Sequence, residues 1–470
     1  MKELVFSSIS FLFFFLPVFL AVYFIVPSTR GRNSVALLFS LVFYAWGEPR
    51  LVLVLLASIG FNMLAGLYID RREGRARAVA LAATVTANLT LLIVYKYINF
   101  IVENLDVALH PLGLGLSLAP IRAPLGISFY TFHALSYVID VYRRRFPANR
   151  NLFEIGLYFT LFPQLVAGPI VRYKTVARQL RSRTNTLGRA SVGARIFVIG
   201  LAQKVLVADQ LARFVEAAFD LAPEPSFADA WLGLLAYTIQ IYFDFNGYSN
   251  MAVGIGLVLG FTLPRNFRLP YSSLSITEFW RRWHMSLSSW LRDYLYIPLG
   301  GNRAGERRTL MNLATVFLLC GLWHGASWNF VLWGVWHGAL LIFERLGFSR
   351  LLGRTAPPLR WAYALLAVMA GWVLFRAHDL LRAGTIYRSL LGFNGFEGVT
   401  FWPGAELTPA VILVLISGCA LATLPRWIRA TEKPALIEAA LDGAWTLGLF
   451  ALSMLYVASG VYSPFLYFRF

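Results

Sequence analysis

The sequence predicts an all-α polytopic membrane protein, and composition and hydropathy patterning predict it together. The 470 residues are 58% hydrophobic, 16% aromatic and only 14% charged, and their mean hydropathy is +0.62. Several apolar runs are long enough to cross a hydrocarbon core of about 30 Å, which takes about 20 helical residues. Backbone amides find no water in lipid, so the spans should be helices. We expect a bundle of roughly 10–12 transmembrane helices with re-entrant segments around a central cavity, in a single integral membrane domain over residues 1–470.

Apolar runs follow one another along the chain. The first, 9–26, is expected to be a retained anchor, because it is long for a signal peptide and lacks a small-x-small cleavage site before Pro27. The runs 34–46 and 310–322 are short and fit re-entrant or buried helices better than spans. The other runs are 51–69, 78–94, 125–141, 152–171, 192–219, 231–245, 251–263, 330–343, 361–375, 408–424 and 440–461.

Basic residues gather in the connections between these runs. The net charge of +18 comes from 42 Lys and Arg against 24 Asp and Glu. Short loops rich in Lys and Arg stay in the cytoplasm, so the charge indicates the orientation of the chain in a membrane. No zinc-type spacing or aromatic-basic interleaving favours nucleic acid, so we expect the lipid bilayer and no nucleic acid as a partner. The basic connections are 71–77, 143–145, 172–189 and 303–308.

The run 152–171 is expected to re-enter the membrane rather than span it. Basic residues flank it on both sides, at 143–150 and 172–183, so both of its ends should be cytoplasmic. Two prolines and a glycine within 163–169 predict a broken helix. Such backbone is tolerated at membrane depth only where protein buries it or where it lines a cavity.

The polar connection 264–308 contains a predicted amphipathic helix. Apolar residues recur at three- and four-residue steps from Ile276 to Leu291. Most of these residues fit an interfacial helix with snorkelling arginines. His284 lies on the adjoining polar stripe and would face inward if the helix dips beneath a cavity.

His324 is the strongest functional signal in the chain. It follows Trp323 at the end of an apolar run, and residues 322–329 hold no other titratable side chain. An ionisable group inside a membrane run is costly, so it indicates a functional site by default. The alternative is a neutral histidine that only bonds a backbone carbonyl, and the segment alone leaves both interpretations open.

Two further ionisable residues lie in apolar segments. Asp244 comes at the end of the run 231–245 and must be protonated, paired or in contact with water, so a helix-terminal ion pair with an arginine and a role near the reaction are both open. His337 repeats a Trp-His-Gly-Ala pattern thirteen residues after His324, and on one continuous helix at about 100° per residue the two would face nearly opposite sides. Only one of them is then expected to line a given cavity. Gly325 and Asn329 lie where the first segment ends, so we expect His324 at a helix end and His337 in the packed interior.

Three segments of this region resemble membrane-bound O-acyltransferases, and most of all the branch that acetylates bacterial alginate. They are Thr-Glu-Phe-Trp-Arg-Arg-Trp-His at 277–284, Arg-Asp-Tyr-Leu-Tyr-Ile-Pro-Leu-Gly-Gly at 292–301 and Gly-Leu-Trp-His-Gly-Ala at 321–326, and the likeness runs from 5–8 to 465–470. The resemblance implies that His324 is the catalytic histidine and that His284 is a second polar residue at the catalytic centre. It also implies a cavity open to both faces, with an acyl thioester on the cytoplasmic side and an acceptor on the other. The chain departs from the alginate-type pattern at Asn246 and Asn250, where serine and aspartate are expected.

The residue types suit acyl transfer from a thioester to a hydroxyl. This reaction needs a base that is neutral near pH 7, which histidine provides. His324 would take the hydroxyl proton and pass it to the leaving thiolate, while His284, Asn329 or a helix N-terminus stabilises the oxyanion. The indoles of Trp323 and Trp328 would exclude water. No metal-ligand spacing and no Gly-x-Ser-x-Gly elbow occurs, so we expect direct transfer with no metal and no bound cofactor, and acetyl-CoA or an acyl-carrier thioester as co-substrate.

The acceptor and some alternatives stay open. The expected acceptor is an envelope polysaccharide such as alginate, reached directly or through a serine of a periplasmic acetyltransferase or esterase-like partner, and D-alanyl transfer to an envelope polymer is a related possibility. A transporter would use His324 and Asp244 as a proton relay, but that class usually shows related halves, and no internal symmetry is visible here. In a passive scaffold the histidines would have no chemical role.

Overall fold

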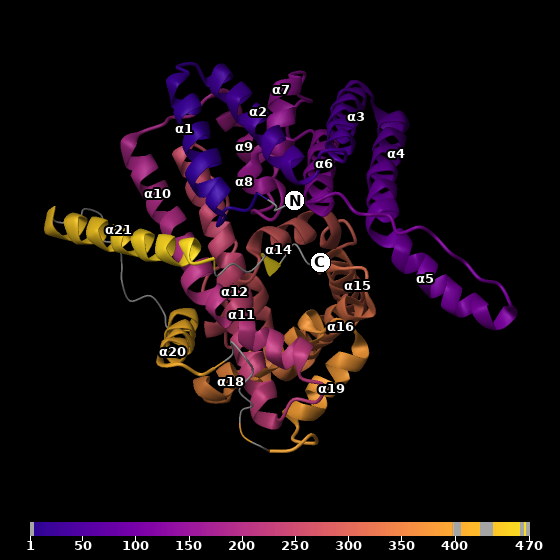
Figure 1. The fold of residues 1–470 in the computed structure, drawn as a ribbon. Coiled ribbons are helices and arrows are strands. Elements are labelled where there is room, and N and C mark those ends of the chain that lie inside the picture. Colours follow the sequence, from indigo (N-terminus) through magenta and orange to yellow (C-terminus); the bar gives the residue numbers. More distant parts are fainter. Residues whose placement is uncertain (1–3, 397, 399–405, 424–435, 461–464, 467–470) are drawn as a thin grey trace. The chain divides into compact units, whose positions relative to one another are not determined.

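The computed structural model describes residues 4–396, 398, 406–423, 436–460 and 465–466, and all regular structure in these residues is helical (Figure 1). Four helical segments of this part are long and apolar enough to cross a membrane: Val52–Arg71, Gly74–Leu112, Leu187–Leu221 and Pro357–Arg376. Shorter apolar helices cover Ser10–Ile25, Pro409–Thr423 and Asp442–Ala458. The predicted all-α polytopic class is confirmed. The total of 10–12 spans, the central cavity and the single domain over 1–470 stay predictions.

The chain forms two compact units. Unit 1 comprises Met1–Phe197 with Met251–Pro264, and unit 2 comprises Val198–Asn250 with Arg265–Phe470. The helices of unit 1 are η1 (Ser10–Phe15), α1 (Leu16–Ile25), α2 (Thr29–Gly47), α3 (Val52–Arg71), α4 (Gly74–Leu92), η2 (Ile93–Tyr97), α5 (Ile98–Leu109), η3 (His110–Leu112), α6 (Ile127–Tyr142), α7 (Leu152–Thr160), α8 (Phe162–Leu165), α9 (Tyr173–Arg181) and most of α10 (Leu187–Ala202).

Helix α6 is the buried centre of unit 1. It packs against α3, α4, α7 and α9, and nearly all of its residues are buried. Paired amides tie α3 to α4, because Asn62 and Asn88 each donate from Nδ2 to the other's Oδ1, at 3.0 and 2.9 Å. At the start of α4, Arg77 donates from Nη2 to the carbonyl of Val141 near the end of α6, at 2.8 Å. Polar side chains therefore hold these helices together. This is common in membrane proteins, because lipid tails are as apolar as the helix surfaces and the hydrophobic effect does not drive the helices to associate.

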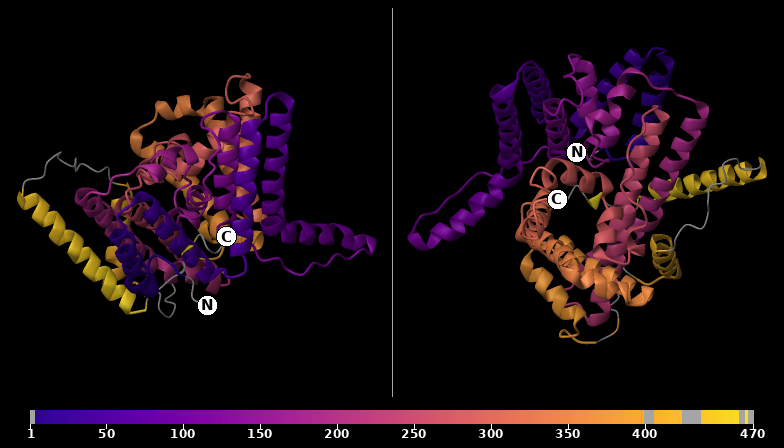
Figure 2. Two further views of the ribbon diagram at one scale, coloured as in Figure 1. Left: turned by 90° about the horizontal axis from the view of Figure 1, so that it is seen from above. Right: turned by 180° about the vertical axis from the view of Figure 1, so that it is seen from behind.

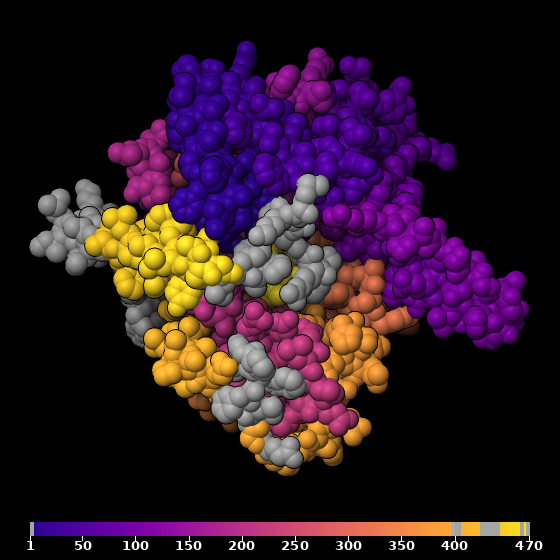
Figure 3. Space-filling model, in the orientation of Figure 1, coloured from indigo at the N-terminus to yellow at the C-terminus, as the bar shows by residue number. Residues whose placement is uncertain are grey.

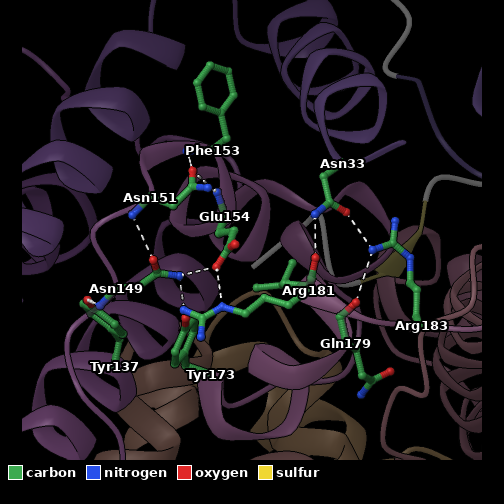
Figure 4. A network of polar contacts seen from close by, with 11 residues as sticks. Asn33, Tyr137, Asn149, Asn151, Phe153, Glu154, Tyr173, Gln179, Arg181 and Arg183 are labelled. Carbon is green, nitrogen blue, oxygen red and sulfur yellow. Dashed lines mark hydrogen bonds and ion pairs between the residues drawn. The ribbon is translucent and has the colours of Figure 1, made fainter. Parts of the chain in front are cut away.

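Hydrogen bonds connect residues before the segment 152–171 with residues after it (Figure 4), and its re-entry into the membrane stays a prediction. Glu154 Oε2 accepts from Asn149 Nδ2 at 2.6 Å and from Arg181 Nε at 3.3 Å, so one carboxylate joins the two flanks. Helix α7 ends at Thr160, and only the single turn of α8 follows. Gly168 is needed beyond that turn, because a Cβ there would lie 2.1 Å from the carbonyl oxygen of Pro163. The predicted broken helix is confirmed.

Unit 2 carries the remaining helices. They are η4 (Gln203–Ala208), α11 (Asp209–Glu216), η5 (Ala217–Leu221), most of α12 (Phe227–Val258), η6 (Pro270–Ser272), α13 (Ile276–Arg282), α14 (Met285–Leu291), η7 (Arg292–Tyr296), α15 (Glu306–His324), α16 (Trp328–Phe343), η8 (Glu344–Phe348), α17 (Ser349–Gly353), α18 (Pro357–Arg376), α19 (Leu380–Leu390), α20 (Pro409–Thr423) and α21 (Leu436–Ala458).

Two predicted boundaries in this region are wrong. The runs 231–245 and 251–263 are not separate, because one helix of 32 residues, α12, continues through both. Gly247 does not break it. A Cβ at Gly247 would lie 2.6 Å from the carbonyl oxygen of Gly200, so this glycine permits a close approach to α10. Conversely, the single amphipathic helix predicted from Ile276 to Leu291 is two helices, α13 and α14, which are separated at Trp283 and His284.

Helices α15 and α16 form a close pair joined by the turn Gly325–Ser327. The short run 310–322 belongs to α15, a helix of 19 residues. Glycines bring the two backbones together: a Cβ at Gly321 would lie 2.2 Å from the carbonyl oxygen of Phe330, and one at Gly334 would lie 2.4 Å from that of Phe317. Small residues allow this approach in membrane proteins, where packing drives helix association.

We predict that Gly334→Ala separates α15 from α16 and lowers the thermal unfolding temperature of the purified protein. The new methyl group meets rigid backbone, so the cost should be about 1–3 kcal/mol. Gly384→Ala is the matched control, because nothing lies within 4 Å of a Cβ at that helical position. An equal unfolding temperature for both variants would contradict the packing account.

Candidate active site

His324 is the last residue of α15, as predicted. The helix stops there because Gly325 is extended, and a Cβ at this position would lie 2.2 Å from the ring of Phe330. Aromatic rings surround the imidazole: the centroids of Trp323, Trp333 and Phe375 lie 4.8, 4.9 and 5.0 Å from its own. The imidazole of His324 thus lies among apolar rings, where α15 ends and α16 begins.

His284 lies in a strained turn between α13 and α14. Its φ of 43° and ψ of 52° are left-handed, a conformation that costs a non-glycine residue about 1–3 kcal/mol. Asn266 holds the turn: its carbonyl accepts from the Met285 N–H at 2.9 Å, and its Oδ1 accepts from the Ser286 N–H at 3.3 Å. Strain of this kind gathers at functional sites, where the surrounding structure holds it in place. The side chain of His284 is buried, and the cavity beneath which it was expected to face inward stays a prediction.

Imidazole and indole rings alternate in a row through unit 2. The centroid of His284 lies 6.1 Å from that of Trp323, which is followed by His324; Trp333 then lies 4.9 Å from His324 and 5.0 Å from His337. We call these five residues the imidazole–indole row. His324 stands at its centre and is 6% exposed, against 1% for His284 and 0% for His337. The structure therefore brings the two predicted site histidines to one indole.

His337 is packed in the interior, as predicted. The two histidines do not share a helix: α15 ends at His324, where Gly325 indicates a helix end, and His337 belongs to α16. Trp280 donates from Nε1 to His337 Nδ1 at 3.4 Å. Nε2 points at α18, where a Cβ at Gly371 would lie 2.7 Å from it. This imidazole is fixed on both sides by protein.

Asp244, in the middle of α12, is one of three residues in a buried charge cluster. Lys204 Nζ lies 2.7 Å from Asp244 Oδ1 and 2.6 Å from Asp209 Oδ1, and all three side chains are buried. Of the two alternatives left open, the structure shows an ion pair, but its partner is a lysine and its place is not a helix end. The next residue, Phe245, packs edge-on against His284 with centroids 4.8 Å apart, so the cluster lies one residue from the imidazole–indole row.

The described C-terminal residues dock on the same stretch of α12. The Leu466 N–H donates to Asp244 Oδ2 at 2.8 Å. Phe465 stacks on Tyr248 with centroids 4.4 Å apart and lies 6.2 Å from Phe245. The last four residues of the string 465–470 lie outside the described residues. Asp244 therefore positions both Lys204 and the chain near its C-terminus.

Asn329 and the two predicted indoles take different places. Asn329 donates from Nδ2 to the carbonyl of Ala377 at 2.7 Å, beyond the end of α18, and its predicted part in stabilising an oxyanion stays a prediction. Trp323 is 5% exposed and lies beside His324. Trp328 is 52% exposed, and the buried indole on the other side of His324 is Trp333.

Several residues of the site carry no signal in the sequence. Lys204 contacts Asp244, 40 residues away along the chain, and Asn266 accepts from the Met285 and Ser286 N–H groups beside His284, 19 and 20 residues away. Trp333 is one of many tryptophans in apolar runs. Among the described residues, no three His, Cys, Asp or Glu side chains are grouped as metal ligands, and residues that would hold a cofactor remain unknown.

The site belongs to a known class of enzyme. The sequence pattern of MBOAT, the membrane-bound O-acyltransferase family, matches residues 43–377, so the chain belongs to this family and is an O-acyltransferase.

Three relatives show the range of the family near this chain. It is 42% identical over 493 residues to the probable alginate O-acetylase AlgI of Pseudomonas putida, covering 99% of this chain and 100% of that protein. It is 36% identical over 430 residues to the peptidoglycan O-acetyltransferase of Helicobacter pylori, covering 83% and 80%. It is 27% identical over 217 residues to the teichoic acid D-alanyltransferase of Bacillus subtilis, covering 43% and 54%. These names all describe acyl transfer to a polymer of the cell envelope.

We predict that Lys204→Met strongly destabilises the protein, because it leaves two carboxylates buried without their shared cation. Removing one partner of a buried pair costs about 3–5 kcal/mol. The matched control is Arg213→Met, which removes a cation from an exposed pair with Glu216 at 3.9 Å and should cost less than about 1 kcal/mol. Both would be measured as unfolding temperatures in one detergent. Similar small shifts for the two variants would show that the cluster contributes little.

Proposed function

We propose that this protein moves an acyl group, preferentially acetyl, from a cytoplasmic thioester across the membrane to hydroxyls of an envelope polysaccharide such as alginate. The observation that carries the proposal is the position of His324, at a helix end and central in the imidazole–indole row. The full-length likeness to a probable alginate O-acetylase supports the acetyl group and the polysaccharide.

His324 is the proposed general base. Its imidazole accepts the proton of the acceptor hydroxyl as that oxygen forms a bond to the thioester carbonyl carbon. The tetrahedral intermediate then collapses, the carbon–sulfur bond breaks, and the imidazolium returns the proton to the leaving thiolate. The products are an ester and a free thiol, and the imidazole is neutral again. No cofactor or metal takes part in this sequence.

The neighbours of His324 support these steps. An N–H of His284, on the far side of Trp323, is the proposed donor that stabilises or positions the oxyanion. The left-handed turn presets this imidazole, so little reorganisation is needed when charge develops. Trp323, Trp333 and Phe375 surround His324 with apolar rings, which favours transfer to the acceptor over hydrolysis of the donor.

The proposed acyl donor and the proposed partner protein act on opposite sides of the membrane. The arginine-rich connections place positive charge where the phosphates of acetyl-CoA would approach, although orientation alone also explains them. A carrier-protein thioester would meet the same surface. On the opposite side, the acceptor is the polymer itself or a serine of a periplasmic partner that completes the transfer. The proposed location is the bacterial inner membrane.

A second candidate is D-alanyl transfer to an envelope polymer. It is favoured by the likeness to the teichoic acid D-alanyltransferase of Bacillus subtilis, which covers 43% of this chain. The same residues would serve, because the thioester and the hydroxyl are unchanged and only the acyl group differs.

We predict that cells producing His324→Ala lose ester-linked acetate from their envelope polysaccharide. Removing a general base should slow transfer by about 10²–10⁴-fold. Acetate would be measured in cells carrying wild-type protein, no protein or the variant, at matched membrane abundance. His378→Ala is the control, because it removes an exposed imidazole outside the row.

Acetate present with wild type and His378→Ala, and lost with His324→Ala, would support the proposed site. Acetate retained by His324→Ala would reject the general base. Acetate unchanged even without the protein would reject acetylation of that polymer, and D-alanine esters would be measured next.

A further inference from the structure

The segment Gly74–Leu112 is too long for one membrane crossing. It is an apolar helical segment of 39 residues, which at a rise of 1.5 Å per residue extends about 58 Å, almost twice the hydrocarbon thickness. The segment bends at the π-helical turn η2, where Tyr97 has φ −115° and ψ −13° before α5 begins. Figure 2 shows α5 turning away from α4. Residues 98–122, which we call the arm, therefore leave the line of the span.

The polar face of the arm is covered by its own return segment. Asn99 donates from Nδ2 to the carbonyl of Ile121 at 2.9 Å and accepts from the Ile121 N–H at Oδ1, at 3.0 Å. About two turns further out, Asp106 Oδ1 accepts from the Leu116 N–H at 2.8 Å. These bonds fasten residues 116–121 along the helix and fix the arm as one element.

The other face of the arm is an apolar stripe whose side chains are exposed in the described part of the chain. Figure 3 shows the purple arm projecting from the helices of its own unit. In the helical part of the stripe, apolar residues recur at three- and four-residue steps. Among them, Ile101, Leu105 and Leu112 are 38, 47 and 72% exposed. The return segment adds Leu114 and Leu116, 57 and 41% exposed. Val107, also exposed, lies outside the stripe.

We propose that this stripe lies in the boundary between headgroups and acyl chains, in the leaflet on the side away from the connection 71–77. Exposed apolar side chains also precede the arm in the same apolar helical segment, at Leu89 in α4 and at Ile93 and Val94 in η2, where a membrane-spanning helix faces lipid. The apolar residues before the arm therefore favour lipid over a protein partner.

The charge pattern fits the same placement. The arm contains one basic residue other than His110, Arg122 at its very end, which pairs with Glu48 at 3.0 Å, and its acidic residues, Glu103 and Asp106, lie away from the stripe. Helix α4 begins beside the basic connection 71–77, so the arm is at the opposite, non-cytoplasmic end. An amphipathic helix at an interface buries its apolar face by about 5–10 Å. The arm would thus anchor the outer end of α4 and the entry to α6 at the membrane surface.

Spin labelling tests the placement without using activity. Single cysteines would replace Leu105, Leu112 and Glu103 in a chain carrying Cys320→Ala and Cys419→Ala, reconstituted as a monomer in lipid nanodiscs and labelled with a nitroxide. Oxygen concentrates in lipid and a nickel chelate stays in water, so their relative collision rates report depth. Leu89→Cys on α4 is the lipid control, and Glu73→Cys, whose native side chain is 82% exposed, is the water control.

We expect labels at positions 105 and 112 to meet oxygen more often than nickel, at a depth of about 5–10 Å, and the label at position 103 to show the reverse. Labels at 105 and 112 that match the water control would overturn the proposal. Labels there that neither reagent reaches would show that protein covers the stripe, which would also overturn it. Neither result would bear on the acyltransferase site, which lies in unit 2.

Discussion

The contact of Trp323 with two imidazoles is the constraint on which the rest of unit 2 depends. His284 and His324 are forty residues apart in the sequence, and one indole lies beside both. For this contact to form, α15 must end at Gly325, α16 must return close along it, and the polypeptide at His284 must take a left-handed conformation. The glycines of α15 and α16 allow the two helices to approach, and the hydrogen bonds of Asn266 hold the turn at His284.

The second constraint is the free-energy cost of burying charge. Burying the charges of Lys204, Asp209 and Asp244 is unfavourable, and their close pairing reduces that cost. Asp244 also accepts the Leu466 N–H, and its neighbour Phe245 packs on His284. Electrostatics, the placement of the chain near its C-terminus and the support of the site are therefore joined on two successive residues of α12.

Much of the fold and of the candidate site could be predicted from residue patterns. The features that could not be predicted have a common cause. The helical class, the broken helix within 152–171 and the helix-end place of His324 follow from local composition and from the positions of Pro and Gly. The break at His284 is hidden, because the apolar periodicity continues across it and only contacts with Asn266 reveal it. The placement of Trp333 and Lys204 depends on tertiary packing between segments far apart in the sequence, which a single sequence does not display.

A double-mutant cycle between His284 and His324 tests the central claim most directly, that the two imidazoles form one acyl-transfer site. The value of kcat/KM for thioester-dependent acylation would be measured with labelled acetyl-CoA in proteoliposomes, for each alanine variant and for the pair. Residues that act as a unit are strongly non-additive, so the account predicts that the double variant is little worse than His324→Ala alone. Losses that simply add, or a His324→Ala enzyme with near-normal turnover, would contradict it.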